Sequence, residues 1–193
     1  ARSLGHFMAQ AAHEYILGKK AIYTSKLAYV REKKKENKRS YTLVLADFDG
    51  GQQDVLLESD EPIMSPTFSP DASKIAYVSF EGGSSKIFVQ EVATGQRELI
   101  SARPGLNAAP AWSPNGSKLA IVLSTEGRAK IYIHDMKSKQ ITPILDEGSI
   151  QTEPVWTNDT KHIIFTSDRS GSAQIYKLEL ATKKIQKLTE YGN

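Results

Sequence analysis

From residue 26 onward, short stretches of alternating apolar and polar residues are separated by turn-forming residues. The segment Lys86-Ile87-Phe88-Val89-Gln90-Glu91-Val92 alternates with the period of two that a half-buried β-strand requires. The residues between such stretches are mainly glycine, asparagine, aspartate and proline, which favour tight turns. The pattern therefore predicts a succession of short strands through this part of the chain.

The first residues follow a different period. Apolar residues recur at spacings of three and four, at Leu4, Phe7, Met8, Ala11, Ala12, Tyr15 and Ile16. This spacing places them on one stripe of a helix. Ser3 is the expected N-cap and Gly18 the expected stop. Because the rest of the chain is strand-like, we expect residues 1–19 to be the last helix of a preceding α/β domain.

A repeat of 44 residues organises the strands. Phe68, Trp112 and Trp156 are spaced at this interval, and the segment Pro66–Asp71 recurs in altered form at 110–115 and 154–159. Each repeat carries four strand patterns. A repeat of this length with four strands is typical of a propeller blade, since solenoid units of similar length are normally helical.

The repeats predict an all-β fold: a partial, incomplete β-propeller of four-stranded antiparallel blades with WD40-like repeats and one N-terminal α-helix. The propeller part is expected over residues 20–193, with blades at about 26–57, 61–101, 107–146 and 151–190. The blade at 26–57 lacks its first strand. We therefore expect this chain to be part of a larger ring that a strand from elsewhere closes.

Composition narrows the possible functions. The chain has no cysteine, which excludes disulfides and thiolate metal sites, and its formal net charge is only +3. Much of the basic excess lies in the run 31–39, which no aromatic residues interrupt, so a solvated hairpin loop is favoured over a nucleic-acid site. No apolar stretch approaches the roughly 20 residues of a membrane span. The chain begins at Ala1 and not at methionine, which favours a mature or truncated form.

Candidate chemistry is sparse. No G-x-S-x-G nucleophile motif occurs, so no catalytic residue is assigned. The histidines are scattered, at His6, His13, His134 and His162, without the spacing of metal ligands. The repeated Asp71, Asn115 and Asp159 are expected to cap turns. The segment 47–52 weakly resembles a calcium loop, but Gly50 and Gly51 displace its ligand pattern. No metal and no cofactor are expected.

The positions just before each first strand are the remaining candidates for function. They are Glu61, Asn107 and Glu153, with Ala109 and Thr152 beside them. The repeat places them around one mouth of the central channel. Two interpretations stay open: hydrogen bonding between loops of adjacent blades, or a docking surface for a protein partner.

Several segments together resemble the TolB family, the periplasmic propeller proteins of the Tol–Pal envelope system. They are His13–Gly18, Thr24–Val30, Ala46–Gly50, Glu61–Asp71, Ala76–Glu81, Asn107–Pro110, Thr152–Trp156 and Phe165–Gly171. The resemblance covers nearly the whole chain. Its most specific part is the helix joined to a blade without a first strand.

The resemblance implies a six-bladed propeller that binds proteins and catalyses no reaction. It implies docking of the lipoprotein Pal at the channel mouth, with roles in outer-membrane integrity and constriction at cell division. It also implies contact of TolA with the N-terminus of the whole protein, and use of the Pal site by some bacteriocins. Where many family members place histidine before the asparagine, this chain has Leu106. The alternative is an accessory propeller of a peptidase or polysaccharide-degrading enzyme whose catalytic domain lies elsewhere.

Overall fold

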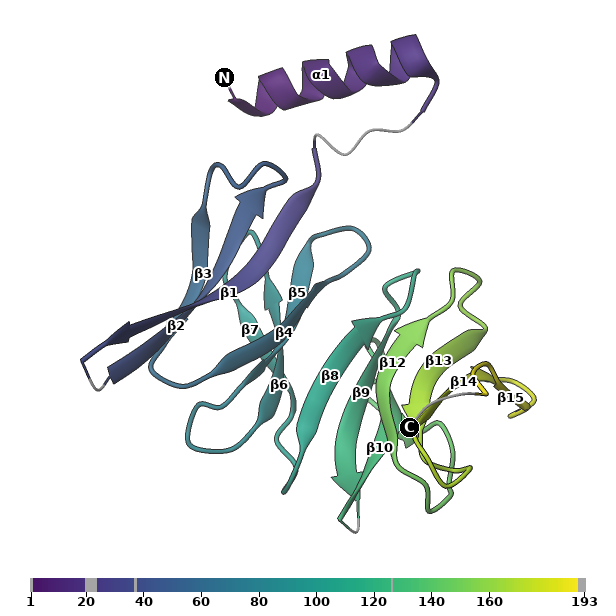
Figure 1. The fold of residues 1–193 in the computed structure, drawn as a ribbon. Helices are drawn as coiled ribbons and strands as arrows, with labels where there is room; N and C mark the ends of the chain where they lie inside the picture. Colours follow the sequence, from purple (N-terminus) through teal and green to yellow (C-terminus); the bar gives the residue numbers. More distant parts are fainter. Residues whose placement is uncertain (1, 20–23, 37, 126, 191–193) are drawn as a thin grey trace. The chain divides into compact units, whose positions relative to one another are not determined.

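The computed structural model spans residues 1–193 and describes residues 2–19, 24–36, 38–125 and 127–190. The chain divides into two compact units, Ala1–Glu58 and Ser59–Asn193. The first unit holds the helix and three strands, and the second holds twelve strands in three sheets (Figure 1).

The first unit contains helix α1 (Arg2–Leu17) and a sheet of order β1-β2-β3, with β1 at Lys26–Lys35, β2 at Lys38–Asp47 and β3 at Asp54–Ser59. The expected stop is confirmed, since Gly18 adopts φ 61 and its N–H donates to the Glu14 carbonyl at 2.9 Å. The expected N-cap is wrong, because Ser3 lies inside the helix. At 16 residues, α1 is too short and too polar to cross a bilayer.

The basic run is strand for most of its length. The long hairpin of β1 and β2 pairs Lys26 with Asp47 at one end and Lys35 with Lys38 at the other. Most of residues 31–39 therefore belong to paired strands, which corrects the expected loop. Their mainly exposed side chains remain solvated, as expected for a hairpin that extends from its sheet.

The second unit consists of three antiparallel sheets of four strands. Their strands are β4 (Ile63–Phe68), β5 (Lys74–Ser79), β6 (Lys86–Glu91), β7 (Arg97–Ser101), β8 (Asn107–Trp112), β9 (Lys118–Thr125), β10 (Arg128–Asp135), β11 (Ile141–Pro143), β12 (Gln151–Trp156), β13 (His162–Ser167), β14 (Gln174–Glu179) and β15 (Ile185–Lys187). Each sheet keeps the sequence order of its strands, as a propeller blade does. The all-β prediction with four-stranded blades is confirmed for this unit.

The first strands of the three blades lie next to one another. Strand β8 contacts both β4 and β12, so these three strands form the inner side of the unit (Figure 1). Because the three blades repeat one another, β4, β8 and β12 all begin at the same end. The sequence positions just before these strands are therefore brought together at that end.

Strand β9, in the middle blade of the unit, is buried on both faces. Leu119 and Ile121 of β9 belong to the core shared with the preceding blade, whereas Ala120 and Val122 belong to the core shared with the following blade. Successive side chains of a strand point to opposite faces. A strand between two neighbours therefore needs a continuous apolar run, and full burial of each Leu or Ile contributes about 1.5–3 kcal/mol.

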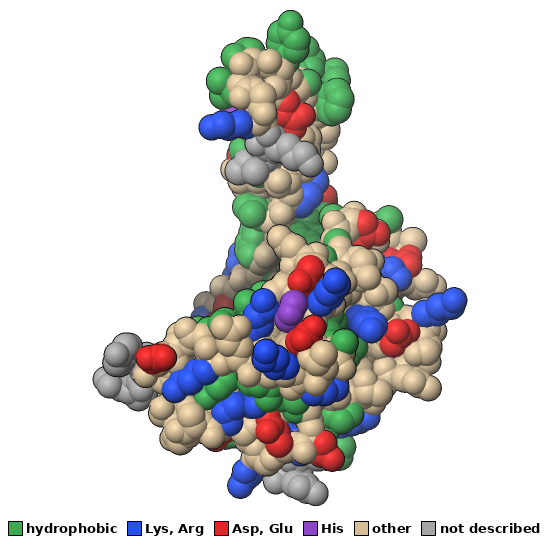
Figure 2. Space-filling model, turned by 90° about the vertical axis from the view of Figure 1, so that its right-hand side faces the viewer, with side chains coloured by type: hydrophobic (Ala, Val, Ile, Leu, Met, Phe, Trp, Pro, Cys, Tyr) green, Lys and Arg blue, Asp and Glu red, His purple; other side chains and the backbone are tan. Residues whose placement is uncertain are grey.

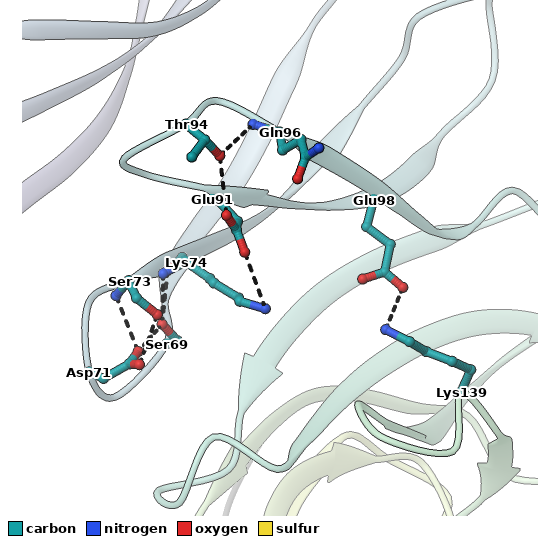
Figure 3. A network of polar contacts seen from close by, with 9 residues as sticks. All are labelled: Ser69, Asp71, Ser73, Lys74, Glu91, Thr94, Gln96, Glu98 and Lys139. Atoms are coloured by element: carbon teal, nitrogen blue, oxygen red, sulfur yellow. Dashed lines mark hydrogen bonds and ion pairs between the residues drawn. The ribbon is translucent and has the colours of Figure 1, made fainter.

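The repeated turns after the first strands are capped by their own side chains. Asp71 accepts hydrogen bonds from the Ser69 hydroxyl at 2.6 Å and the Ser73 hydroxyl at 2.8 Å (Figure 3). Asn115 and Asp159 accept the equivalent bonds from Ser113 at 2.9 Å and Thr157 at 2.6 Å. The expected turn-capping role of the three residues is confirmed.

Candidate functional site

The candidate site is the end of the second unit at which the three inner strands begin. We define it as residues 61–65, 106–109 and 150–153 and call it the rim. The 44-residue repeat makes positions 62, 106 and 150 equivalent, and likewise 63, 107 and 151, and 65, 109 and 153. The rim residues proposed from the sequence therefore do not occupy one equivalent position.

Asn107 opens β8 and is fully buried. Its Nδ2 donates to the carbonyls of Ser85 at 2.9 Å and Arg103 at 2.7 Å, and its Oδ1 accepts from the Ser101 hydroxyl at 2.6 Å. The equivalent Gln151 is also fully buried. Buried amides are normally satisfied in this way. Asn107 thus holds the loop before β8, and its hydrogen bonds match the first of the two interpretations above.

Ala109 and Glu153 are equivalent residues of β8 and β12. The Glu153 side chain is exposed, and its Oε2 accepts a hydrogen bond from the Thr166 hydroxyl at 3.2 Å. Ala109 is half-buried. Thr152, which directly precedes Glu153 in β12, is half-buried as well. The third equivalent residue is the exposed Ser65, which the sequence analysis missed although the 44-residue spacing identifies it.

Glu61 lies two residues before β4 and is exposed. Its backbone N–H donates to the Ser59 hydroxyl at 2.9 Å. It matches neither the Asn107 position nor the Ala109 and Glu153 position of the repeat. Glu61 therefore contributes a carboxylate to the rim from a loop and not from the inner strand itself.

Exposed apolar side chains lie among these polar residues. Leu106, Ile150 and Met64 are 40%, 42% and 53% exposed. The backbone N–H of Leu106 donates to the Ser124 hydroxyl at 2.9 Å, and that of Ile150 to Asp168 Oδ1 at 2.8 Å. Ile150 and Met64 were not singled out from the sequence, although Ile150 occupies the Leu106 position one repeat later.

The rim offers a surface for binding and carries no catalytic set of residues. Its residues carry carboxylates, two amides, hydroxyls and apolar groups, without a nucleophile beside a general base. Mixed apolar and polar surfaces of this kind suit protein partners.

A second group of polar residues lies in the first unit. His6 Nδ1 is 3.6 Å from Asp47 Oδ2, and His6 Nε2 is 3.4 Å from Asp49 Oδ2. The His6 ring also meets Phe48 edge-on at 5.1 Å between centroids. His6 is therefore half-buried against the turn after β2.

These three side chains include donors that divalent metals use, and their ligand atoms lie within 4.8 Å of one another. Asp47 is already paired with the Lys26 ammonium at 2.5 Å. That positive charge disfavours a cation at the same carboxylate. The contacts of His6 with Asp47, Phe48 and Asp49 join α1 to the turn between β2 and β3.

Comparisons with known proteins agree with this architecture. The model of the TolB beta propeller domain matches residues 13–193. The Tol-Pal system protein TolB of Xylella fastidiosa is 44% identical over 108 residues, which are 56% of this chain and 25% of that protein. The crystal structure of TolB from Acinetobacter baumannii superposes with a TM-score of 0.90 at 40% identity, over 99% of this chain and 48% of that chain.

More distant structures share the fold alone. A Mycobacterium tuberculosis puromycin-hydrolyzing peptidase matches with a TM-score of 0.67 at 14% identity, over 87% of this chain and 28% of that chain. The chain spans about half the length of the solved TolB structure it matches. On the match to the family model over nearly its whole length, the chain belongs to the TolB β-propeller family.

Proposed function

We propose that this chain is a protein-binding part of a Tol–Pal system protein and that its rim docks the lipoprotein Pal. The supporting observation is the composition of the rim: exposed Leu106 and Ile150 lie at equivalent positions of adjacent blades, close to the exposed Glu153 carboxylate. The buried centre of a protein interface is more apolar than the surface around it, and the polar groups at its edge stay in contact with solvent.

The hydrogen bonds of the rim support the proposal further. Backbone bonds from Leu106 and Ile150 to side chains of adjoining strands and loops hold these apolar residues in place. A surface fixed before binding loses less conformational entropy when a partner docks. Buried Asn107 contributes indirectly, because its amide fixes the loop that carries Leu106.

The cellular role is inferred from the resemblance to the TolB family. We infer a periplasmic location and a role in outer-membrane integrity and constriction during cell division, as the resemblance implies. Contacts with TolA and with bacteriocins are inferred for the whole protein, and no residue of this chain is assigned to them. The likeness to peptidases rests on fold alone, so it does not favour an enzyme accessory role.

The test is a calorimetric titration with purified Pal of this chain and of the longest open reading frame that contains it. Glu153→Ala and Leu106→Ala should each weaken binding about tenfold, the scale of a central interface residue. Asn107→Ala should weaken binding together with stability, because it leaves buried carbonyls without donors. Equal affinity of the Glu153 and Leu106 variants and the wild type would reject the assigned surface.

Glu91→Ala is the matched control. Glu91 lies at the other end of the blades, where its carboxylate is 3.9 Å from Lys74 Nζ (Figure 3). Both side chains are substantially exposed, so their ion pair contributes little to stability. Removing this carboxylate should leave the affinity for Pal unchanged.

A further inference from the structure

Three residues of the rim adopt a backbone conformation that their side chains disfavour. Ser65, Ala109 and Glu153 have φ values of 51, 47 and 53. This left-handed region is normally occupied by glycine, because a Cβ atom there approaches the following carbonyl oxygen. The three residues are exact counterparts in the 44-residue repeat, so the conformation is a property of the blade and not of one loop.

Each of the three residues opens a β-bulge in its inner strand. The pairing of β4 with β5 jumps from Met64 to Thr67, so Ser65 and Pro66 together face one residue of β5. Strands β8 and β12 show the same jump, from Ala108 to Ala111 and from Thr152 to Val155. The bulge type with a left-handed first residue usually carries glycine at that position.

A proline follows the left-handed residue in all three bulges, at Pro66, Pro110 and Pro154. Proline suits the second bulge position because it has no N–H that the interrupted ladder would leave unpaired. The proline ring also restricts the residue before it to extended conformations. The left-handed residue thus meets a second conformational conflict, and the surrounding blade must hold it in place.

The turn at the opposite end of the same strands offers an internal comparison. Ala72, Gly116 and Thr160 are equivalent there, with φ values of 56, 70 and 59. Glycine occurs at one of these three turn positions, whereas none of the three bulges contains it. The two sets have nearly the same backbone angle, but only the bulges belong to the rim.

We propose that the three glycine-free bulges hold the rim rigidly in its binding shape, with Ser65, Ala109 and Glu153 as positioning residues. This inference rests on the proposed function. Strained backbone persists where surrounding structure enforces it, and such sites are concentrated at ligand-binding positions. A side chain at each bulge limits the backbone to few conformations, which preserves the spacing of the neighbouring Met64, Ala108 and Thr152.

The test compares alanine with glycine at each bulge, within the full-length protein, against Pal. Ser65→Gly is measured against Ser65→Ala, Glu153→Gly against Glu153→Ala, and Ala109→Gly against the wild type. In each pair the side-chain chemistry beyond Cβ is equal. The glycine member should have a melting temperature equal or higher by about 2 °C, because the strain is relieved. It should bind Pal about three- to tenfold more weakly, because the rim is less preorganised.

Ala72→Gly and the pair Thr160→Gly and Thr160→Ala are matched controls at the turn. They should show the same thermal gain without a change in affinity. Amide hydrogen exchange of the free protein should be faster at the bulges of the glycine variants, which reports rigidity directly. A merely structural role would make affinity and stability change in the same direction, and equal affinity within the Ala/Gly pairs would overturn the proposal.

Failure of this inference is distinguishable from failure of the proposed function. If the wild-type protein does not bind Pal, the proposed function and the bulge inference are both rejected. If Glu153→Ala weakens binding but the glycine member of each pair equals its alanine partner, the docking surface stands and the positioning role alone is rejected.

Discussion

The indole Nε1 of Trp156 donates a hydrogen bond to the backbone carbonyl of Ala111 at 3.0 Å. Trp112 makes the same bond one repeat earlier, to the carbonyl of Thr67 at 3.2 Å. In both cases the tryptophan of one blade is bonded to the inner strand of the blade before it. The tryptophans that recur at the 44-residue spacing, Trp112 and Trp156, therefore join neighbouring blades by a hydrogen bond.

This bond predicts the effect of Trp156→Phe. Phenylalanine keeps most of the buried ring area but removes the donor, which leaves the Ala111 carbonyl without its partner. We expect a loss of about 1–2 kcal/mol in the free energy of unfolding, measured by urea denaturation. Trp156→Tyr does not restore an N–H at the same place and should also lose stability. Wild-type stability of Trp156→Phe would show that the bond contributes nothing.

The buried His134 predicts a dependence of stability on pH. Its side chain is nearly inaccessible, and neither ring nitrogen has a hydrogen-bond partner among the described residues. Burial first, and the charge of Lys139 second, lower the pKa of His134 below its ordinary value, against the smaller opposite effects of Glu98 and Asp135. Glu98 and Lys139 themselves pair at 2.6 Å (Figure 3).

Because the folded pKa of His134 is depressed, the unfolded chain binds its proton more readily. The stabilisation is therefore complete above the unfolded pKa of about 6.5, and it is lost as pH falls below this value toward the folded pKa. His134→Gln should flatten the pH dependence of urea unfolding between about pH 7 and 5. Glutamine is a natural choice, since Gln90 occupies the equivalent buried position. An unchanged slope would contradict this account.

The capped turns predict a second transition at lower pH. Hydrogen bonds from the Thr157 hydroxyl and the Lys161 amide lower the pKa of Asp159 to about 2. For Asp71, the hydroxyls of Ser69 and Ser73 have the same effect, also to about 2. Because the two pKa values are lower in the folded protein than in the unfolded chain, both carboxylates stabilise the fold. This contribution to the free energy of unfolding is present above about pH 4 and is lost as pH falls toward 2.

Asn115 shows how to test the turns, because it caps its own turn without a titratable group. The double variant Asp71→Asn and Asp159→Asn should fold normally at pH 7. Its unfolding free energy should fall less than that of the wild type between pH 4 and 2. A parallel acid-unfolding curve for variant and wild type would show that these carboxylates are not responsible.

The contacts of His6 with the turn after β2 predict that this side chain holds α1 in place. His6→Ala removes the side chain that meets Asp47, Phe48 and Asp49, and should increase amide hydrogen exchange throughout α1. His13→Ala on the same helix is the control and should have a smaller effect. Addition of Zn²⁺ or of a chelator should leave the melting temperature of the wild type unchanged. A metal-dependent shift that His6→Ala abolishes would instead reveal a metal site.

Most large apolar side chains of the α1 stripe are exposed. Tyr15 is 92% exposed and Ile16 is 73% exposed, and Figure 2 shows apolar side chains on the surface of the helix. The periodicity that marks one face as apolar says nothing about which element covers it. The assignment of residues 1–19 to a preceding domain stays a prediction.

The sequence predicted the blades well because their physical signals are local. The recurring Trp112 and Trp156 and the apolar runs between turns identify four-stranded units without reference to any distant contact. The rim was harder, because the burial of its side chains depends on the bulges. One inserted residue interrupts the alternation along the strand, so Gln151 is buried whereas Glu153, two residues later in β12, is exposed.

Contacts between distant residues were beyond the sequence. His6 and Asp49 meet only because α1 lies against the turn after β2, and no spacing rule relates them. Ser65 is a different case. Its place 44 residues before Ala109 and 88 before Glu153 identifies it. Its residue type does not, because a serine there has no functional signature of its own.

Hydrogen exchange of the full-length protein with and without Pal tests the docking rim most directly. Binding should slow exchange in residues 61–65, 106–109 and 150–153. It should leave the turns at 69–74, 113–118 and 157–162, at the opposite ends of the same strands, as they are in the free protein. Protection confined to those turns, or no protection of the three rim segments under saturating Pal, would contradict the account.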